Sequence, residues 1–403
     1  MPDHARSSDP AVQRQLDRFA QLSPGRDILG LERITALLAA LGDPQDQLPP
    51  VFHIAGTNGK GSTCAFLRAI LERAGQTVHV YTSPHLVRFN ERIRVAGTLI
   101  DDAALAPLLA EVLDVAEAHA IGPSFFEATT AAAFLAFRRT PADACVIEVG
   151  LGGRLDATNV VIPSICGVAQ IGLDHQAFLG DTIAEIAGEK AGIAKAGIPL
   201  VVLAQEPVAR DAILAVAEAA AAPVWLEGRD WAIDPTLAPS LPGAFQHRNA
   251  NLAAQMARLA GIGAPSIAAG IATASWPARL QRLAPGSLTA DRAVWIDGAH
   301  NPAAAAELAN ELARQPMHVV IGILANKDAD GILAALAPHA RGLTFVPVPH
   351  HDSHSPEILA ARWGGQTSAS LENALEQTHG DVLVAGSLYL AGEVLRLNGT
   401  LPE

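Results

Sequence analysis

The residues with the clearest chemical potential lie in HIAGTNGKGST, residues 53–63, where closely spaced glycines surround a lysine and a serine. An apolar run precedes this segment and a helix-forming stretch follows it, which is the setting of a phosphate-binding loop. Its backbone N–H groups can turn toward an anion, and the following helix adds its positive dipole end. Lys60 can reach terminal phosphates, and Ser62 can ligate Mg²⁺. Because Gly61 separates these two residues, the spacing departs from the common G-x-x-x-x-G-K-[ST] form, and a plain glycine-rich turn is the alternative.

Polar residues also stand where later apolar runs end. Glu148 lies near the end of ACVIEVG, where an unpaired carboxylate would be costly to bury, so a metal ion or its bound water is a fitting partner. An ion pair with Arg154 is the alternative. Asp174 and His175 end the next apolar run, and ligands of open α/β sheets gather at the carboxyl ends of strands. His175 is therefore a candidate for the same metal shell, with a satisfied loop histidine as the alternative.

Lys190 lies in GEKAGI on an expected helix. As an unmodified cation it would oppose a metal site. Taken by itself, the sequence favours a surface lysine paired with Glu189 or Glu185.

A third polar group is WIDGAHNP, residues 295–302. Asp297 follows an apolar run, and Asn301-Pro302 suits the start of a helix, so this turn is expected to face a ligand. A role for Asp297 as a helix N-cap is the alternative. Arg279, in SWPARL, can reach toward a cleft between domains.

The elements that must position these groups alternate between short apolar runs and longer Ala-, Leu- and Glu-rich segments. Strands are expected at 51–56, 77–83, 144–150, 164–173 and 198–204, and helices at 62–75, 125–139, 181–195 and 247–261. This order predicts an α/β fold with a mostly parallel sheet, and the continuously apolar strands predict helices on both of its faces.

A Pro- and Gly-rich stretch at 233–246 interrupts this order, and a second alternation begins after residue 276. Strands are expected at 293–299, 318–324, 342–349 and 381–387, and helices at 302–314, 329–340 and 388–397. We therefore expect two domains, a larger one over 1–280 and a smaller α/β domain over 285–403.

Composition narrows the classes of function. The 403 residues are 50% hydrophobic and carry a net charge of −13, which argues against a general grip on nucleic acid. No apolar run approaches the roughly 20 residues of a membrane helix, and the first ten residues do not resemble a signal peptide. Three scattered cysteines indicate neither a disulfide framework nor a zinc site, so a cytoplasmic location is expected.

In chain order, these motifs resemble the folylpolyglutamate synthase/dihydrofolate synthase family within the Mur ligase superfamily. The matching stretches run from ILGLERI at 28–34 to VLVAGS at 382–387 and include GTNGKGST, YTSPHLVRFNERIRV, FFEATT, EVGLGGRLDATN, GLDH, EKAGI and DGAHNP. The resemblance implies an N-terminal P-loop domain of Mur ligase type and a smaller, Rossmann-like C-terminal domain. It implies ATP and Mg²⁺ as cofactors, and dihydropteroate or reduced folate with L-glutamate as substrates of a monomeric ligase.

The resemblance also implies roles for single residues. The ATP-binding residues would be Gly59, Lys60, Gly61, Ser62, Asn251, Arg279, Asp297 and His300. The metal ligands would be Ser83, Glu148 and His175. The catalytic residues would be Lys60, His175 and Lys190, and the last matches a lysine that the family carbamylates, which turns the cation into an anionic oxygen donor.

The pterin side follows from the same resemblance. The residues implied there are Ile28, Leu29, Gly30, Leu31, Phe125, Phe126, Glu127 and Asp156. Aromatic rings suit stacking on a pterin, although Phe126 is equally well explained as core packing.

Two positions depart from the family pattern. Arg248 replaces an Asn that often follows the His of the linker helix in the wider Mur-type pattern, and Ala278 replaces the usual Gly before Arg279.

The expected reaction is amide formation through an acyl phosphate. Two other ATP-dependent enzymes are alternatives, a Mur-type ligase for another carboxylate and a P-loop NTPase or kinase. A non-catalytic relative that serves as a binding module is a third. Whether one or both folate activities are present is left open by the residues, although ILGLERI favours both.

Overall fold

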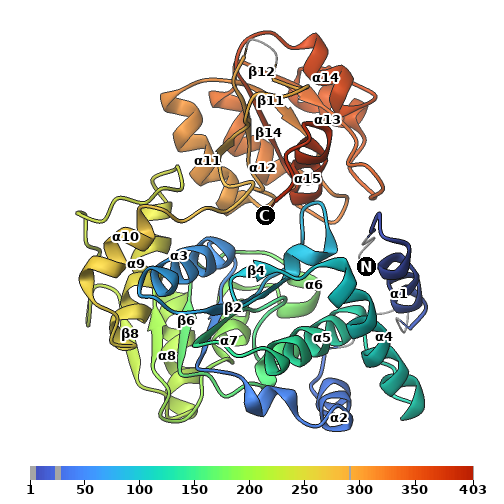
Figure 1. Cartoon of the computed structure of the whole chain (residues 1–403). Coiled ribbons are helices and arrows are strands. Elements are labelled where there is room, and N and C mark those ends of the chain that lie inside the picture. The colour runs from blue at the N-terminus through green and yellow to red at the C-terminus, as the bar shows by residue number, and fades with distance from the viewer. Residues whose placement is uncertain (1–5, 23–28, 290–291, 403) are drawn as a thin grey trace. The chain divides into compact units, whose positions relative to one another are not determined.

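The computed structural model describes residues 6–22, 29–289 and 292–402. Its contacts divide the chain into two compact units (Figure 1). Among the described residues, those up to Ser240 and from 247 to 274 belong to the first unit, and those from 241 to 246 and from 275 to 402 belong to the second.

The first unit is built on an eight-stranded sheet with the order β4-β3-β2-β5-β1-β6-β7-β8. Six of these strands are parallel, and β3 and β4 form an antiparallel extension at one edge. The strands are β1 Val51–Ala55, β2 Val78–Tyr81, β3 Ile93–Val95, β4 Thr98–Leu99, β5 Ala144–Glu148, β6 Ile165–Val168, β7 Leu200–Val202 and β8 Val224–Leu226.

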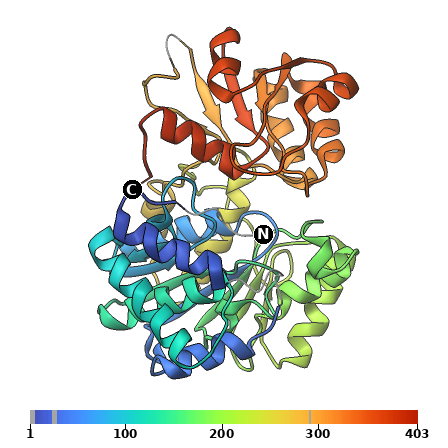
Figure 2. The same cartoon turned by 90° about the vertical axis from the view of Figure 1, so that its right-hand side faces the viewer.

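Helices cover both faces of this sheet (Figures 1 and 2). They are α1 Pro10–Leu22, α2 Glu32–Ala40, α3 Lys60–Arg73, α4 Asp102–Ala118, α5 Phe125–Arg139, α6 Gln176–Leu179, α7 Ile183–Ala191, α8 Pro207–Ala219, α9 Gln246–Leu259 and α10 Ala264–Ile271. Side chains alternate between faces along a strand. Val51 packs in the cluster formed with α1, α2, α4 and α5, and Ala55 on the same face packs in the cluster formed with α7 and α8. On the opposite face, Met256 of α9 lies against Gly167 of β6.

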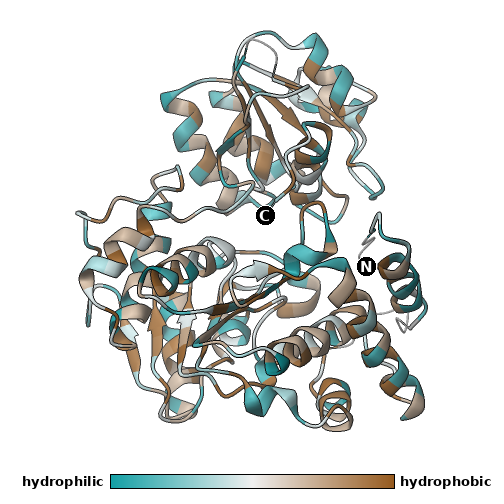
Figure 3. Ribbon diagram, viewed as in Figure 1, coloured by the Kyte–Doolittle hydropathy of each residue, from teal (hydrophilic) through white to brown (hydrophobic). Residues whose placement is uncertain are grey.

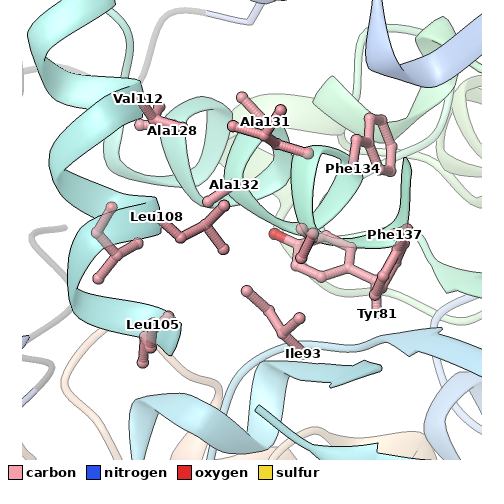
Figure 4. Close-up of a cluster of buried hydrophobic side chains, with 14 of the residues drawn as sticks. Tyr81, Ile93, Leu105, Leu108, Val112, Ala128, Ala131, Ala132, Phe134 and Phe137 are labelled. Carbon is pink, nitrogen blue, oxygen red and sulfur yellow. The ribbon is translucent and has the colours of Figure 1, made fainter. Parts of the chain in front are cut away.

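Figure 4 shows the first of these clusters, in which α4 and α5 meet the β2–β3 edge. Leu108, Ala131 and Phe134 are buried there with Tyr81 and Ile93 of the sheet. Small alanines on α5 let the two helices approach each other closely, and burial of the larger side chains stabilises the contact.

The second unit has a six-stranded sheet with the order β13-β12-β11-β14-β10-β9, parallel except for β9. Its strands are β9 Gln281–Arg282, β10 Val294–Ile296, β11 His318–Ile321, β12 Gly342–Phe345, β13 Gln366–Thr367 and β14 Val382–Ala385. Its helices are α11 Pro302–Arg314, α12 Ala329–Leu336, α13 Pro356–Trp363, α14 Leu371–Gln377 and α15 Leu388–Leu397. In both units, hydrophobic residues concentrate on the strands and on the helix faces that meet them (Figure 3).

The predicted fold class, two α/β units with mostly parallel sheets, is confirmed. The strand–helix alternation placed the central elements correctly. It did not predict α1 and α2, which precede the first expected strand, or α4, which follows the unpredicted strands β3 and β4. The three cysteines are free and buried, and burial raises the pKa of all three thiols. None of the helices in the described ranges is long and apolar enough to cross a membrane.

His53 of β1 is fully buried between these elements, and burial lowers the pKa of its imidazole to about 3, with Lys195 adding a smaller effect. An unfolded histidine binds a proton below about pH 6.5, whereas the folded one does not until about pH 3. Unfolding therefore becomes easier as the pH falls from about 6.5 toward 3, and the stabilising contribution is complete above that window.

We predict that acidification from pH 6.5 to 4.5 lowers the free energy of unfolding by about 2–3 kcal/mol through protonation of His53 in the unfolded state. The measurement is the urea unfolding midpoint at both pH values, for the wild type and for His53→Gln, which keeps a hydrogen-bonding group but does not titrate. The variant should lose less stability on acidification, and an identical pH dependence in both proteins would contradict the prediction.

Candidate active site

Four neighbouring strands of the first sheet bring candidate residues to one edge. In the order β2-β5-β1-β6, the carboxyl ends of these parallel strands lead to Ser83, to Glu148, to the glycine loop before Lys60 and to the segment that carries His175. The fold therefore places these groups along the edge where ligands of parallel sheets bind.

The glycine loop has the backbone geometry that its sequence predicts. Gly59 precedes α3 with a φ of 88°, in the left-handed region that favours glycine. A Cβ at this position would lie 2.3 Å from Oδ1 of Asn249, so the close approach of α9 also requires glycine. Gly61 and Ser62 are buried in the first turn of α3, and Lys60 donates from Nζ to the carbonyl of Gly56 at 3.0 Å.

The loop is fastened to the segment that follows β6. Thr57 and Asn58 both donate their backbone N–H to the carbonyl of Gln170, at 2.8 and 3.1 Å. The Thr57 hydroxyl donates to the carbonyl of Gly172 at 2.9 Å and accepts from its N–H at 3.1 Å. These bonds fix the phosphate-binding loop relative to His175, which lies three residues after Gly172.

Glu148 ends β5 with a carboxylate that is only 5% exposed. Its Oε2 accepts the backbone N–H of Ser83 at 3.3 Å. The charges of Glu148 and Lys60 both act on the buried thiol of Cys64 in the first turns of α3, and they shift its pKa in opposite directions. The two charged groups therefore lie within electrostatic reach of one thiol, which supports their convergence on one site.

Arg154 is not the partner of Glu148. It forms an ion pair with Glu189 at 2.7 Å, with its own side chain 57% exposed. The ion-pair alternative for Glu148 is therefore wrong.

His175 caps the short helix α6 in the left-handed conformation, with a φ of 53°. Its ring is exposed, and Nε2 lies 3.9 Å from Oδ1 of the buried Asp174. A conformation of this kind in a non-glycine residue costs about 1 kcal/mol or more, and such strain gathers at functional sites.

Lys190 near the end of α7 is 3% exposed, which contradicts the surface-lysine interpretation. Glu189 is paired with Arg154, and Glu185 caps its own helix by accepting the N–H groups of Asp181 and Thr182. A Cβ at Gly153 would meet the carbonyl of Lys190 at 2.7 Å, so the loop after Glu148 packs tightly on this end of α7.

The candidate metal ligands are chemically suited to Mg²⁺. A buried carboxylate on Glu148 and the adjoining Ser83 supply oxygen donors, which hard cations prefer, and His175 supplies one nitrogen. No group of three or more His, Cys, Asp or Glu side chains in the described parts of the chain is arranged to hold a metal. The proposed set contains only two residues of those types, so substrate oxygens and water would have to complete the shell.

In helix α9, Asn249 lies against the glycine loop, whereas the sequence singled out Asn251. The amide of Asn251 is occupied within the first unit, because its Oδ1 accepts the N–H of Asp234 at 2.7 Å and its Nδ2 donates to the carbonyl of His247 at 2.9 Å. A nucleotide contact of Asn251 stays a prediction.

Arg248, which replaces the Asn of the wider Mur-type pattern, has a structural role. Its guanidinium donates to the Gln170 side chain at 2.6 Å and to the carbonyl of Ala204 at 2.5 Å. Gln170 is the residue whose carbonyl holds the glycine loop, so Arg248 supports that attachment from α9.

In the second unit, Arg279 precedes β9, and Asp297 and His300 follow the carboxyl end of the neighbouring antiparallel strand β10. Asp297 is 5% exposed and accepts the N–H groups of Leu280 at 2.7 Å and Ala299 at 2.8 Å. Burial raises the pKa of Asp297, while the charge of Arg279 and, more weakly, that of His300 oppose the shift. These three predicted residues therefore lie within electrostatic reach of one another.

The helix that follows this cluster begins as predicted. Asn301 is its N-cap, accepting the N–H of Ala304 at 2.9 Å, and Pro302 is its first residue. The N-cap alternative for Asp297 is therefore wrong. Ala278 has a φ of 55°, which explains why glycine suits this position in the family pattern.

The residues expected on the pterin side surround the amino end of α5. Ile28 lies outside the described residues, while Leu29, Gly30 and Leu31 lead into α2 and are half-buried. Ser124 and Glu127 form a capping box at the start of α5, and Arg33 of α2 donates to Glu127 at 3.0 Å. This ion pair ties the segment after Leu31 to α5.

The aromatic pair has two different surroundings. Phe125 meets Phe19 and Phe89 edge-on, and the guanidinium of Arg92 lies 5.6 Å from the centre of its ring. The ring of Phe126 presses on Gly150, where a Cβ would come within 2.4 Å. Both rings pack partly on the core. For Phe126, core packing and contact with a pterin are therefore compatible with each other.

Comparisons with known proteins show the family and the fold of this chain. A sequence profile of the Mur ligase glutamate ligase domain matches residues 279–388. The dihydrofolate synthase/folylpolyglutamate synthase of Bacillus subtilis is 34% identical over 91% of this chain and 94% of its own. The chain belongs to the folylpolyglutamate synthase/dihydrofolate synthase family. The solved structure of Mycobacterium tuberculosis folylpolyglutamate synthase complexed with ADP matches 98% of this chain and 99% of its own, with 30% identity and a TM-score of 0.89.

Family members differ in length. A probable bifunctional folylpolyglutamate synthase/dihydropteroate synthase of Halobacterium salinarum is 37% identical over 90% of this chain, but this chain spans only 49% of that protein.

We predict that Lys60→Ala lowers kcat/KM for ATP by about 1000-fold, because it removes the positive charge of the phosphate-binding loop. Steady-state kinetics with varied ATP measure the effect, and thermal unfolding shows whether the fold is retained. Arg210→Ala, which removes a surface cation paired with Asp211, is the matched control and should stay within about twofold of wild type. Near-normal activity of the Lys60 variant would remove the loop from the reaction.

Proposed function

We propose that the chain is an ATP-dependent ligase that adds L-glutamate to dihydropteroate and to reduced folates through an acyl phosphate. The observation that carries the proposal is the attachment of the glycine loop beside the Glu148 and His175 strand ends. The names of the family relatives and the ADP complex of the Mycobacterium tuberculosis enzyme support it. The segment from Leu29 to Leu31 beside α5 favours both activities over one.

The chemistry begins with a carboxylate, which is a poor acylating agent because its leaving group would be oxide. Transfer of the γ-phosphoryl group of ATP to a carboxylate oxygen yields an acyl phosphate and ADP. The amine of glutamate then attacks the acyl carbon, an amide bond forms, and phosphate leaves. The protein does little covalent chemistry, so positioning and charge neutralisation provide most of the catalysis.

The chain's own residues would act on the triphosphate through fixed positive groups. The N–H groups at the start of α3, including those of Gly59, Gly61 and Ser62, bind phosphate oxygens, and Lys60 neutralises the transferred group. Asn251, Arg279, Asp297 and His300 are our proposed further nucleotide-binding residues.

Ser83, Glu148 and His175 would hold Mg²⁺, which supplies charge neutralisation for the phosphate oxygens when it is bound. We propose that Lys190 is carbamylated, because carbamylation would place an anionic oxygen donor in this buried position, where a bound Mg²⁺ would compensate its charge. The carbamate would then face the metal side of the site as an oxygen donor.

Leu29, Gly30 and Leu31, together with Ile28, would cover the pterin end of the substrate, and Phe125, Phe126, Glu127 and Asp156 would line it. We further propose that residues 1–280 and 285–403 act as an ATP-binding and a C-terminal domain, and that the chain works as a cytoplasmic monomer.

We predict phosphate release that requires glutamate together with either dihydropteroate or a reduced folate. The assay supplies ATP, Mg²⁺ and glutamate with each acceptor separately, and mass spectrometry identifies products enlarged by one glutamyl residue. Phosphate release that is independent of glutamate would indicate an NTPase, and turnover only with another carboxylate would indicate a different Mur-type ligase.

The carbamylation of Lys190 is tested separately. We predict a carbamate signal in ¹³C NMR after incubation with labelled bicarbonate, and its loss in Lys190→Ala together with an approximately 100-fold fall in kcat. Lys195→Ala, at a half-buried lysine that donates to the Asn159 carbonyl at 3.1 Å, should keep the signal. A wild-type protein without the signal, and with activity unaffected by removal of dissolved CO₂, would rule the modification out.

A further inference from the structure

The imidazole of His53 occupies an unusual position for a polar group. Its exposure is 0%, and on the sheet it lies beside Ile147 of β5 and Cys166 of β6. It shares its face of β1 with Val51 and Ala55, which belong to two different apolar clusters. His53 therefore lies at the boundary between two apolar clusters. An apolar side chain could fill this space without the cost of removing a polar imidazole from water.

A chain of hydrogen bonds starts from this ring. Nε2 of His53 lies 2.8 Å from Oγ1 of Thr158, and that hydroxyl in turn donates to Oδ1 of Asp156. The backbone N–H of Thr158 donates to the same carboxylate oxygen at 3.0 Å. Because the hydroxyl proton is committed to the carboxylate, Thr158 accepts from His53, and Nε2 carries the imidazole proton.

The opposite direction, in which Asp156 donates to Thr158 and Thr158 donates to Nε2 of His53, is less favourable. It would place a proton on Asp156, which already faces the N–H donors of Thr158 and Leu151. It would also place a proton on Nδ1 of His53, a buried atom that has no hydrogen-bond partner among the described residues. A buried unpaired donor is costly, so the hydrogen bonds run from His53 through Thr158 to the carboxylate of Asp156. Burial raises the pKa of this carboxyl, and the hydrogen bonds from Thr158 and Leu151 oppose that shift.

Asp156 closes the loop that follows Glu148. Its Oδ2 accepts the N–H of Leu151 at 2.8 Å, and its own N–H donates to the carbonyl of Gly153 at 3.2 Å. Since Oδ1 binds Thr158, this one carboxylate joins both ends of residues 151–158. The same loop begins at Gly150, on which the ring of Phe126 packs.

We infer that His53 is a positioning residue for this loop. Its Nε2–H orients the Thr158 hydroxyl, which holds Asp156 and keeps residues 150–158 in the shape that receives the pterin end of the substrate. This inference rests on the proposed function for the identity of the substrate. His53 itself is fully buried and acts through Thr158, so its effect should fall on pterin affinity and leave ATP affinity unchanged.

The kinetic test uses the full chain with dihydropteroate or the reduced folate that it accepts. His53→Leu and Thr158→Val each break the series of hydrogen bonds from His53 to Asp156. His53→Gln keeps a hydrogen-bond donor at 53, and Thr158→Ser keeps a hydroxyl at 158. We expect KM for the pterin substrate to rise about tenfold in each of the first two variants, with KM for ATP within about twofold. The double variant should resemble either single variant, because both remove one chain, and the conservative variants should stay near wild type.

An unchanged pterin KM in Thr158→Val would overturn the inference, as would an effect confined to ATP or full additivity of the two changes. If His53→Leu does not fold, Thr158→Val and Thr158→Ser still decide between these results.

Hydrogen exchange tests the loop without any substrate, so it stays informative if the proposed function fails. The N–H groups of Leu151 and Thr158 donate to Asp156 and should exchange about tenfold faster in Thr158→Val, while backbone N–H groups of β7 should be unaffected. Equal protection in the wild type and in Thr158→Val would overturn the inference, whereas an inactive wild type with altered exchange would reject the proposed function alone.

Discussion

The hydrogen bonds between Thr57 and the segment at Gln170 and Gly172 are the interaction on which the candidate site depends. A glycine-rich loop is conformationally free, and without attachment its N–H groups would not face one point. The two N–H donations to Gln170 and the reciprocal bonds with Gly172 remove that freedom. They also bring the loop into register with the segment that leads to His175, so one set of contacts fixes both the phosphate-binding backbone and a proposed metal ligand.

Several buried carboxylates follow one pattern. Glu148, Asp156 and Asp297 are each at most 5% exposed, and each accepts at least one backbone N–H. Backbone donors can hold an anion without contributing a counter-charge that would compete with a bound cation. The carboxylates of the two units thus remain fixed in place while their charge can still act on a ligand.

Much of this arrangement could be predicted from the sequence, for identifiable reasons. The parallel sheet follows from continuously apolar strands, and strand order places Ser83, Glu148 and the glycine loop at one edge once the strands are parallel. The N-cap at Asn301 followed from Asn-Pro before an Ala-rich helix. Local pattern is sufficient in these cases because neighbouring residues determine the outcome.

Other features depend on contacts between distant residues, which no local pattern encodes. The buried state of Lys190 depends on packing against the loop at Gly153, and the partner of Arg154 is 35 positions away in the chain. Asn249 was missed for the same reason, because its importance comes from its approach to Gly59. The histidine at position 53 could have been noticed as a polar residue inside a five-residue buried strand, but Thr158 lies 105 positions away.

Because Gly59 and Asn249 are in contact, the residue at one position restricts the residue at the other, although they are almost 200 positions apart in the sequence. A side chain at 59 would collide with the carboxamide of Asn249 in α9, so a phosphate-binding loop with any residue other than glycine at 59 would also require a change at 249. A smaller residue at 249 would relieve this contact alone, because the φ of 88° at Gly59 would still favour glycine there.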